Sequence, residues 1–487
     1  MHLYRLLKFS NSFDPMLSSH RLAGTKQPSR WRGNVVASEE ALDHNIFVGY
    51  IRLVTDLVAI LNEREARDAK ATLAEIDRAL TSEQVFEQIV AGLPPEVVNG
   101  YRRALRLEGA DLQEKFDAYE AAKSGDYSQL KRIAGADPGV ALIVARITRG
   151  YSQKELARRL GLKEQQIQRY EADRYRSISL SNYRRVAHVL GVRWDIELSD
   201  AAAPWHASGW EFATDISSND IKKVLKHAVE HRWFAGGADG FSEKGNPNYL
   251  SKYIADHIMN YGSPTLLRSG LNMSGQVNDL FLIAWKSRVI RVAEGIIDKD
   301  NIKYLSLDIS WLRELVRLSP KVDGPAQARE SLRTQGIVLV CEPQISGLNL
   351  DGAAFLVGRT PVIGLTLRRD TIDSFWFTLL HEIAHVILHY RTGLRSGFFD
   401  DIDSPNVDEI EKEADGFASN MLIPDEQWQR STARIAKDSA TIVRLAEELG
   451  IHPAIIFGRV QKERGNYATF AEKIGRGGVR KWLLEHQ

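Results

Sequence analysis

Apolar residues recur at intervals of three and four along much of the chain, which is the spacing of one face of a helix. Residues 45–135 keep this pattern almost throughout, as in NIFVGYIRLVTDLVAILNE and DLQEKFDAYEAAKSG. Pro138 precedes another helical run, and the helical pattern SWLRELVRLSP ends at Pro320. We therefore predict a helical region over residues 45–135, with a possible role in dimerisation or partner binding.

The period of the pattern changes near residue 336. GIVLVCEP is a short β-branched run between Gly336 and Pro343, as expected of a buried strand. AAFLVGRTPVIGLTLR predicts two further strands joined at Gly358–Pro361, and a helix follows for which Asp370 is a plausible N-cap. Strands followed by helices predict an α+β domain at this end of a multidomain, mainly α chain.

A chain of 487 residues is too long for a single hydrophobic core, so several domains are expected. Composition changes at SDAAAPWHASG, which we interpret as a linker. The predicted segments are an irregular stretch 1–44, the helical region 45–135, a smaller helical domain 138–196, the linker 197–209, a mixed region 210–320 of unknown role, and the α+β domain 321–487.

Candidate chemistry lies in FTLLHEIAHVILHY, residues 377–390. His381 and His385 are four residues apart, so a helix would direct both imidazoles to one side. Apolar residues cover the rest of the helix, and buried imidazoles lose hydration unless something binds them. One interpretation is a pair of hydrogen-bonded core histidines. The spacing favours a metal site, with Glu382 near the metal-bound water.

A catalytic zinc ion needs three protein ligands and one open position. Cys341 is the only cysteine, so any metal must be bound by His, Asp or Glu. The best source of a third ligand is VDEIEKEADGFASNMLIP, residues 407–424, which predicts a helix with an apolar face. Glu411 and Glu413 flank that face at similar angles, so periodicity does not choose between them. A solvated acidic helix face would look the same.

HEIAHVILH followed by EADGFASNMLIP resembles the ImmA/IrrE family of metallopeptidases, over roughly residues 336–456. This resemblance implies Zn²⁺ bound by His381, His385 and Glu413, with Glu382 as the catalytic base of a metalloendopeptidase. Asp415 stands where the family commonly has Asn. By the same resemblance, the expected substrate is a repressor protein of the helix-turn-helix type.

The second informative stretch is YSQKELARRLGLKEQQIQRYEADRYRSISLSNYRRVAHVLGV, residues 151–192. Ser152 suits an N-cap, and Gly161 suits the tight turn between two short helices. Ala157, Gly161 and Ile167 have the spacing of a helix-turn-helix. Residues 140–194 contain 12 Arg and Lys against 4 Asp and Glu, a balance that favours a polyanion such as DNA.

If residues 164–171 form the recognition helix, its exposed polar positions could pair with base edges. Other polar residues around it could contact phosphates. The predicted base-reading residues are Gln165, Gln166, Gln168 and Arg169, and the predicted phosphate contacts are Gln153, Lys163, Arg174 and Arg176. Such units usually bind as dimers, so a homodimer on double-stranded operator DNA is expected. A helix-turn-helix used for protein contact is the alternative.

Residues 141–194 resemble the XRE, lambda-repressor-like domain, and LGLKEQQIQRYEADRY is similar to HigA-type antitoxins, some of which are fused to ImmA/IrrE peptidases. The leading interpretation is a DNA-binding transcriptional regulator with its own zinc peptidase. The competing class is an antitoxin that binds a cognate toxin, represses its own operon and keeps the metal site for sensing or structure. A third is a peptidase whose helix-turn-helix docks a protein substrate.

No apolar run is long enough for a membrane span or a signal peptide, so we expect a cytoplasmic protein, nucleoid-associated when DNA-bound. Near the C-terminus, IVRLAEELGIHPAIIFGRVQ repeats the helix-turn-helix spacing at Ala446, Gly450 and Ile456. The apolar HPAIIFG replaces the polar KEQQIQR there, so we favour a packing role over a second DNA reader.

Overall fold

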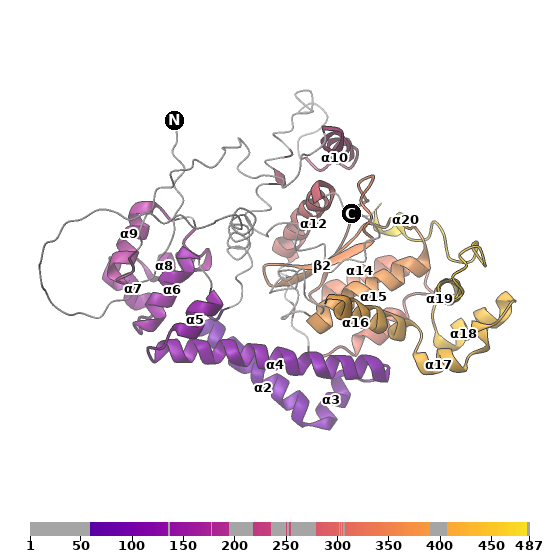
Figure 1. Ribbon diagram of the computed structural model, residues 1–487, viewed down its shortest axis with the longest axis horizontal. Coiled ribbons are helices and arrows are strands. Elements are labelled where there is room, and N and C mark those ends of the chain that lie inside the picture. Colours follow the sequence, from indigo (N-terminus) through magenta and orange to yellow (C-terminus); the bar gives the residue numbers. More distant parts are fainter. Residues whose placement is uncertain are drawn as a thin grey trace, which may run out of the picture. The chain divides into compact units, whose positions relative to one another are not determined.

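A computed structural model shows a mainly helical chain with one small sheet (Figure 1). It describes residues 59–134, 137–176, 178–193, 218–234, 250, 253–254, 279–300, 302, 304, 307–389 and 407–484. The chain divides into two compact units. The first unit comprises residues 1–69 and 114–205, and the second comprises residues 70–113 and 206–487.

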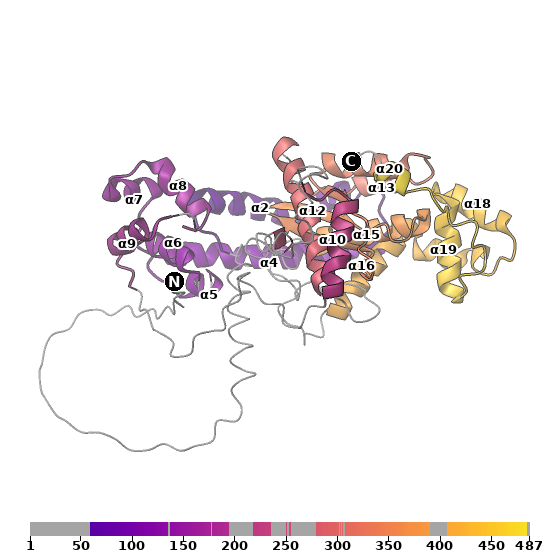
Figure 2. The ribbon, with the colours of Figure 1, turned by 90° about the horizontal axis from the view of Figure 1, so that it is seen from above.

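Four consecutive helices of the first unit (Figures 1 and 2) are α6 (Pro138–Thr148), α7 (Gln153–Leu160), α8 (Glu164–Ala172) and α9 (Leu180–Val189). Leu142, Leu156 and Ile167 are fully buried between them. Ser152 caps α7 by accepting a hydrogen bond from the backbone N–H of Glu155, as predicted. Gly161 ends α7 in the left-handed conformation, with φ at 68°, so the predicted tight turn is confirmed.

Further helices of the chain precede this group: α2 (Glu63–Thr81), α3 (Glu83–Ile89), α4 (Pro95–Lys123) and α5 (Ser128–Ala134). The described part of the predicted region 45–135 is therefore helical. The unit boundaries fall inside α2 and α4, so this region is divided between the two units. The predicted segments 1–44 and 197–209 lie outside the described residues.

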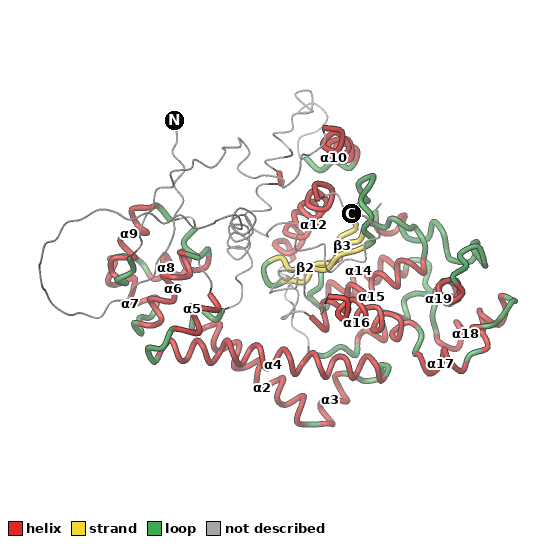
Figure 3. Tube along the Cα trace, viewed as in Figure 1, coloured by secondary structure: helices red, strands yellow, loops and turns green. Residues whose placement is uncertain are grey.

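The second unit contains a three-stranded sheet (Figure 3) made of β1 (Val338–Cys341), β2 (Gly352–Val357) and β3 (Thr360–Leu365). The strand order is β1-β3-β2, with β1 parallel and β2 antiparallel to β3. All three strands are where the sequence predicted them. Nearly every strand residue is buried, so helices must cover both faces of the sheet.

One face of the sheet packs against a core built largely from helices of the C-terminal half. Leu339, Cys341 and Ile363 point into this core. Its helices are α13 (Trp311–Val316), α14 (Gly324–Thr334), α15 (Ile372–His389) and α16 (Val407–Leu422). Residues of α3 and α4, among them Phe86 and Leu105, belong to the same core. The unit around the sheet is therefore wider than the segment 321–487 that we assigned to the α+β domain.

The opposite face packs against α10 (Ser218–Glu230) and α12 (Asp279–Asp300). Val338, Val340 and Val362 point to this side, where Trp285 is fully buried. The sequence indicated no role for residues 210–320. In the structure, α10 and α12 of this region form the second layer of an α/β/α arrangement, while α13 belongs to the core on the other face.

The chain ends in α17 (Asp425–Arg430), the 3-10 turn η3 (Thr432–Arg434), α18 (Ser439–Leu449), α19 (Pro453–Arg464) and α20 (Arg480–Leu483). Gly450, between α18 and α19, has φ at 68°, as Gly161 has. However, α19 packs against α15, and Ile456 and Phe457 are buried in the core. This placement agrees with the packing role that we favoured.

Asp370 does not cap the helix that it precedes. Its Oδ1 accepts hydrogen bonds from the backbone N–H groups of Val479 and Arg480, both at 3.0 Å. The prediction of an N-cap at Asp370 is therefore wrong, because tertiary structure brings the start of α20 to this carboxylate. None of the described helices is long and apolar enough to cross a membrane.

Candidate metal centre and DNA-binding surface

Helix α15 presents His381 and His385 on the same side, as their four-residue spacing predicts. Their Nε2 atoms lie 3.1 Å apart, and their ring centroids 4.8 Å. Only 10% of the His381 side chain and 12% of the His385 side chain are exposed. The two imidazole nitrogens therefore converge on one small, nearly enclosed space.

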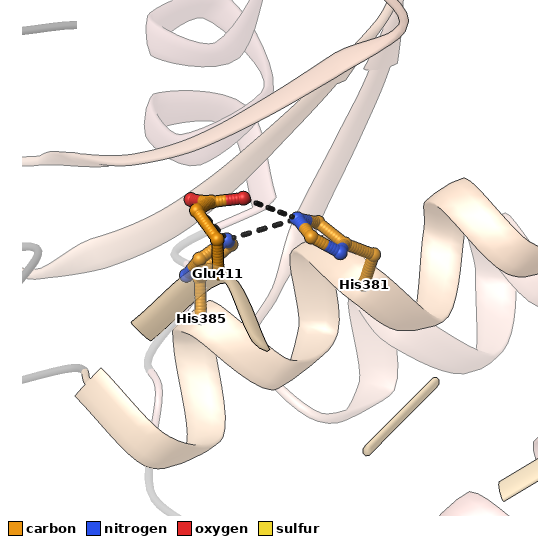
Figure 4. Close-up of side chains that lie close together, drawn as sticks. All are labelled: His381, His385 and Glu411. Carbon is orange, nitrogen blue, oxygen red and sulfur yellow. Dashed lines mark hydrogen bonds and ion pairs between the residues drawn. The ribbon is translucent and has the colours of Figure 1, made fainter. Parts of the chain in front are cut away.

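Glu411 of α16 faces this space (Figure 4). Its Oε2 lies 3.2 Å from Nε2 of His381, and its Oε1 lies 3.4 Å from Nε2 of His385. Both oxygens are buried, and among the described residues no further hydrogen bond reaches them beyond these two imidazole contacts. The ligand atoms of the three residues all lie within 4.8 Å of one another, so among the described residues this trio could hold a metal ion.

The structure corrects the placement that the family resemblance implied for Glu413. Its side chain is 42% exposed, and its Oε1 accepts a hydrogen bond from Nη2 of Arg103 at 2.9 Å. Residues two apart on a helix do not face the same way, so α16 can direct only one of these glutamates towards α15. It directs Glu411.

Asp415 lies one helical turn after Glu411, so it faces the same side of α16. Its Oδ1 lies 3.0 Å from Nδ1 of His381. A carboxylate in this position accepts the Nδ1 proton, which fixes the ring and leaves the Nε2 lone pair directed at the centre. This role was not predicted from the sequence, although the four-residue spacing from Glu411 could have revealed it.

The Nε2 atoms of His381 and His385 and the Glu411 carboxylate can all act as hydrogen-bond acceptors, and there are too few protons between them to satisfy each one. A proton on Nε2 of His381 can serve either His385 or Glu411, whereas a cation would be bound by all three groups at once. Two imidazole nitrogens and a carboxylate oxygen are a donor set that suits zinc. The residues therefore fit a divalent metal.

In the first unit, α8 carries the predicted base-reading residues. Gln165, Gln168 and Arg169 are exposed, and Gln168 donates a hydrogen bond to Glu164. Gln166 is half-buried, and its Nε2 donates to the hydroxyl of Tyr170 at 3.0 Å. Three of the four predicted positions therefore lie on the free face of the helix.

The predicted phosphate contacts divide in the same way. Lys163 and Arg176 are exposed. Gln153 is half-buried and donates to Glu171, which also forms a buried ion pair with Arg146. Only 14% of the Arg174 side chain is exposed, and its Nη1 lies 4.0 Å from Asp137. Gln153 and Arg174 are thus turned towards partners within the unit.

Comparison with known proteins identifies two domains. Residues 335–457 match the family model of the IrrE N-terminal-like domain. The chain carries an IrrE-like metallopeptidase domain. Residues 143–196 match a helix-turn-helix family model, so α6 to α9 form a DNA-binding domain of the XRE type. No curated protein and no solved structure matches the chain.

Glu382 of the IrrE-like domain is buried beside the start of β2. The residue is 4% exposed, and a Cβ on Gly352 would lie 2.9 Å from its Oε1. Burial raises the pKa of Glu382 to about 7, and the nearby Glu411 also raises it, while His381 acts in the opposite direction. Its pKa therefore lies near neutrality, as general acid–base chemistry requires.

Burial dominates the electrostatics of the histidines. It lowers the pKa of His385 well below the usual value and that of His389 to about 4, so both are neutral at pH 7. Burial also acts to lower the pKa of His381, but the carboxylates of Asp415 and Glu411 raise it to about 10. The carboxylates of Asp415 and Glu411 therefore favour positive charge at this point of the centre.

A pocket of about 290 Å³ opens beside His381 and Glu382. Helices α15, α16 and α19 and the residues leading into β2 form its walls. It is therefore large enough to take a side chain of a peptide held at the centre.

Proposed function

We propose that this protein is a DNA-binding transcriptional regulator whose IrrE-like domain is a zinc-dependent endopeptidase. The observation that carries the proposal is the convergence of His381, His385 and Glu411 beside a buried Glu382. The ligand atoms of His381, His385 and Glu411 lie within 4.8 Å of one another, and beyond the two imidazoles no described residue donates a hydrogen bond to the Glu411 oxygens. These residues would hold the metal.

A zinc ion bound there supplies the Lewis acidity that activates water and polarises a scissile carbonyl. Glu382 takes the proton of the attacking water and returns it to the leaving amine. The carboxylate of Asp415 keeps the His381 ring in orientation. The buried surroundings exclude bulk water, which strengthens each of these interactions.

In the DNA-binding domain we propose that α8 is the recognition helix. Gln165, Gln168 and Arg169 are exposed on it and have the donors and acceptors that read adenine and guanine in the major groove. Lys163 and Arg176 would contact phosphates and set the register. Binding as a homodimer to a two-fold operator fits a single unit of this kind.

The substrate class follows from the family resemblance: a repressor protein of the helix-turn-helix type. The alternative, an antitoxin with a sensory or structural metal site, uses the same residues. Turnover separates the two, because an antitoxin needs none. Supporting the peptidase is the position of Glu382, which is buried beside His381 and the Glu411 carboxylate, where burial raises its pKa.

The test is to incubate purified full-length protein with the products of neighbouring genes, with zinc and with a chelator. We expect cleavage of a repressor with zinc, none with chelator, and none with Glu382→Gln, which should still bind zinc. Glu409→Gln, an exposed glutamate on α16, is the control and should cleave as the wild type does. Equal cleavage by wild type and Glu382→Gln would refute the peptidase. If the protein binds the product of a neighbouring gene tightly without cleaving it, the antitoxin function would be favoured.

A further inference from the structure

The pocket beside the candidate metal centre continues along α15. Asp373, Phe377 and His381 all line it, and they follow one another at intervals of four on one helix face. Asp373 and His381 are eight residues apart, which is about 12 Å along a helix axis at a rise of 1.5 Å per residue. The pocket therefore leads from the centre towards Asp373.

Most charged groups in this pocket already have partners. Arg368 donates two hydrogen bonds of 2.9 Å to the carboxylate of Asp351, and Asp415 contacts His381. Among the cations, Arg459 lies 3.5 Å from Asp425, and Lys462 lies 3.9 Å from Asp415. Asp373 and Arg369 also line the pocket and belong to none of these pairs.

Asp373 is the carboxylate at one end of the pocket. Its Oδ1 is buried and has no hydrogen-bond partner among the described residues, while Thr371, the backbone N–H of Ser374 and Arg369 stabilise the charged carboxyl less than burial destabilises it. Burial raises the pKa of this carboxyl, because its charged form is poorly solvated. A buried oxygen without a donor is costly, and a cation brought by a ligand would remove that cost.

Apolar side chains form part of the walls of this pocket. Phe377, Leu422 and Ile455 line the pocket, and the last two are buried. Gly458 of α19 lies against Asp373, where a Cβ would come within 2.6 Å of Oδ2, so a larger residue would close this end. An apolar passage that ends at a carboxylate matches the apolar stem and charged tip of Lys or Arg.

We propose that this pocket is a specificity subsite that binds a basic side chain of the substrate, with its stem against Phe377 and its cation at Asp373. The inference rests on the proposed peptidase function and adds a substrate class to it. A length of about 12 Å corresponds to three to four residues of extended chain, so the basic residue lies within about three residues of the scissile bond.

The test separates binding from cleavage. One arm uses zinc-loaded Glu382→Gln protein and fluorescent nonapeptides in which one arginine moves through an alanine–leucine sequence. A matched set carries citrulline, which has the shape of arginine without its charge. At one or two positions we expect arginine to bind at least about tenfold more tightly, as hydrogen bonds to charged groups allow. Equal affinity of the two sets at every position would overturn the proposal.

Variants then assign the preference to one carboxylate. In the Glu382→Gln background, Asp373→Asn should abolish the difference between arginine and citrulline, and Asp373→Glu should retain part of it. Asp351→Asn removes a carboxylate of the same pocket that Arg368 already neutralises, so the preference should persist. A preference that survives Asp373→Asn, in protein that still binds zinc, would refute the role of Asp373.

The second arm gives the same peptides to the wild-type protein and maps the cleavage sites by mass spectrometry. Cleavage without preference for a nearby basic residue would refute the subsite and leave the peptidase standing. A binding preference for arginine without any cleavage would refute the peptidase and leave the subsite standing.

Discussion

At the scale of single residues, the candidate centre depends on which side of α16 a carboxylate occupies. Glu411 and Glu413 are two positions apart, yet one is buried against two imidazoles and the other pairs with Arg103 at the surface. Asp415 joins the buried side because it follows Glu411 by one turn. The same helix thus supplies a candidate ligand and the residue that orients another ligand.

This difference predicts opposite outcomes for two matched substitutions. Glu411→Gln should weaken zinc binding by more than the roughly 10- to 100-fold that loss of an outer-shell partner costs, because it removes a ligand. Glu413→Gln should leave zinc affinity unchanged. Competition with a chromophoric chelator measures both. If Glu413→Gln instead loses the metal while Glu411→Gln keeps it, the assignment of the third ligand is reversed.

The sequence alone could identify the histidine pair and Glu382, because their roles follow from a spacing within one helix. It could not choose between Glu411 and Glu413, since the choice depends on how α16 lies against α15. The resemblance pointed to Glu413, and the geometry favours Glu411. Asp373 was also out of reach, because its surroundings come from α19, far along the chain.

At the scale of elements, the sheet shows why some predictions held and others failed. The β-branched runs and the Gly–Pro punctuation predicted all three strands, because strand period and turn chemistry are local. The helices on the second face were missed because burial there is tertiary: α12 reads as mixed in sequence, but Trp285 packs directly over Gly364. A Cβ at Gly364 would lie 2.6 Å from the Trp285 ring.

Gly364→Ala therefore tests the packing of α12 on the sheet. We expect the free energy of unfolding to fall by ~1–3 kcal/mol, the usual cost of overpacking a core. Chemical denaturation followed by circular dichroism measures it. Gly295 lies on α12 with open space around it, so Gly295→Ala is the control. It should leave the free energy of unfolding unchanged or raise it by up to ~1 kcal/mol. Equal stability of Gly364→Ala and wild type would contradict the close contact.

A single substitution can also test whether α8 is the recognition helix. Arg169 is exposed on it, and Arg reads guanine through two hydrogen bonds. We expect Arg169→Ala to weaken operator binding by ~1–3 kcal/mol while affinity for random DNA changes little. Gel shifts with both DNAs measure this, with Arg158→Ala on α7 as an exposed control. Equal losses on operator and random DNA would show that Arg169 contacts phosphate.

At the scale of the whole molecule, charge is divided between the parts of the chain. The net charge is +1, but residues 140–194 alone carry +8. The remainder is therefore acidic, at −7. We therefore expect only the helix-turn-helix domain to bind a polyanion such as DNA. The affinity should depend steeply on salt concentration, because binding releases cations that are associated with DNA.

Substitution of Lys163 tests whether DNA binding is confined to the helix-turn-helix domain. It is exposed at the start of α8, where a phosphate contact would fix the register of the recognition helix. Lys163→Ala should weaken binding to all sequences and reduce the slope of log affinity against log salt by ~1, since one phosphate contact is lost. Lys299→Ala removes an exposed lysine from α12 in the second unit and should leave both affinity and slope unchanged. Fluorescence anisotropy over a range of salt concentrations gives the two slopes. If Lys299→Ala lowers the slope as much as Lys163→Ala does, DNA is also bound outside the helix-turn-helix domain.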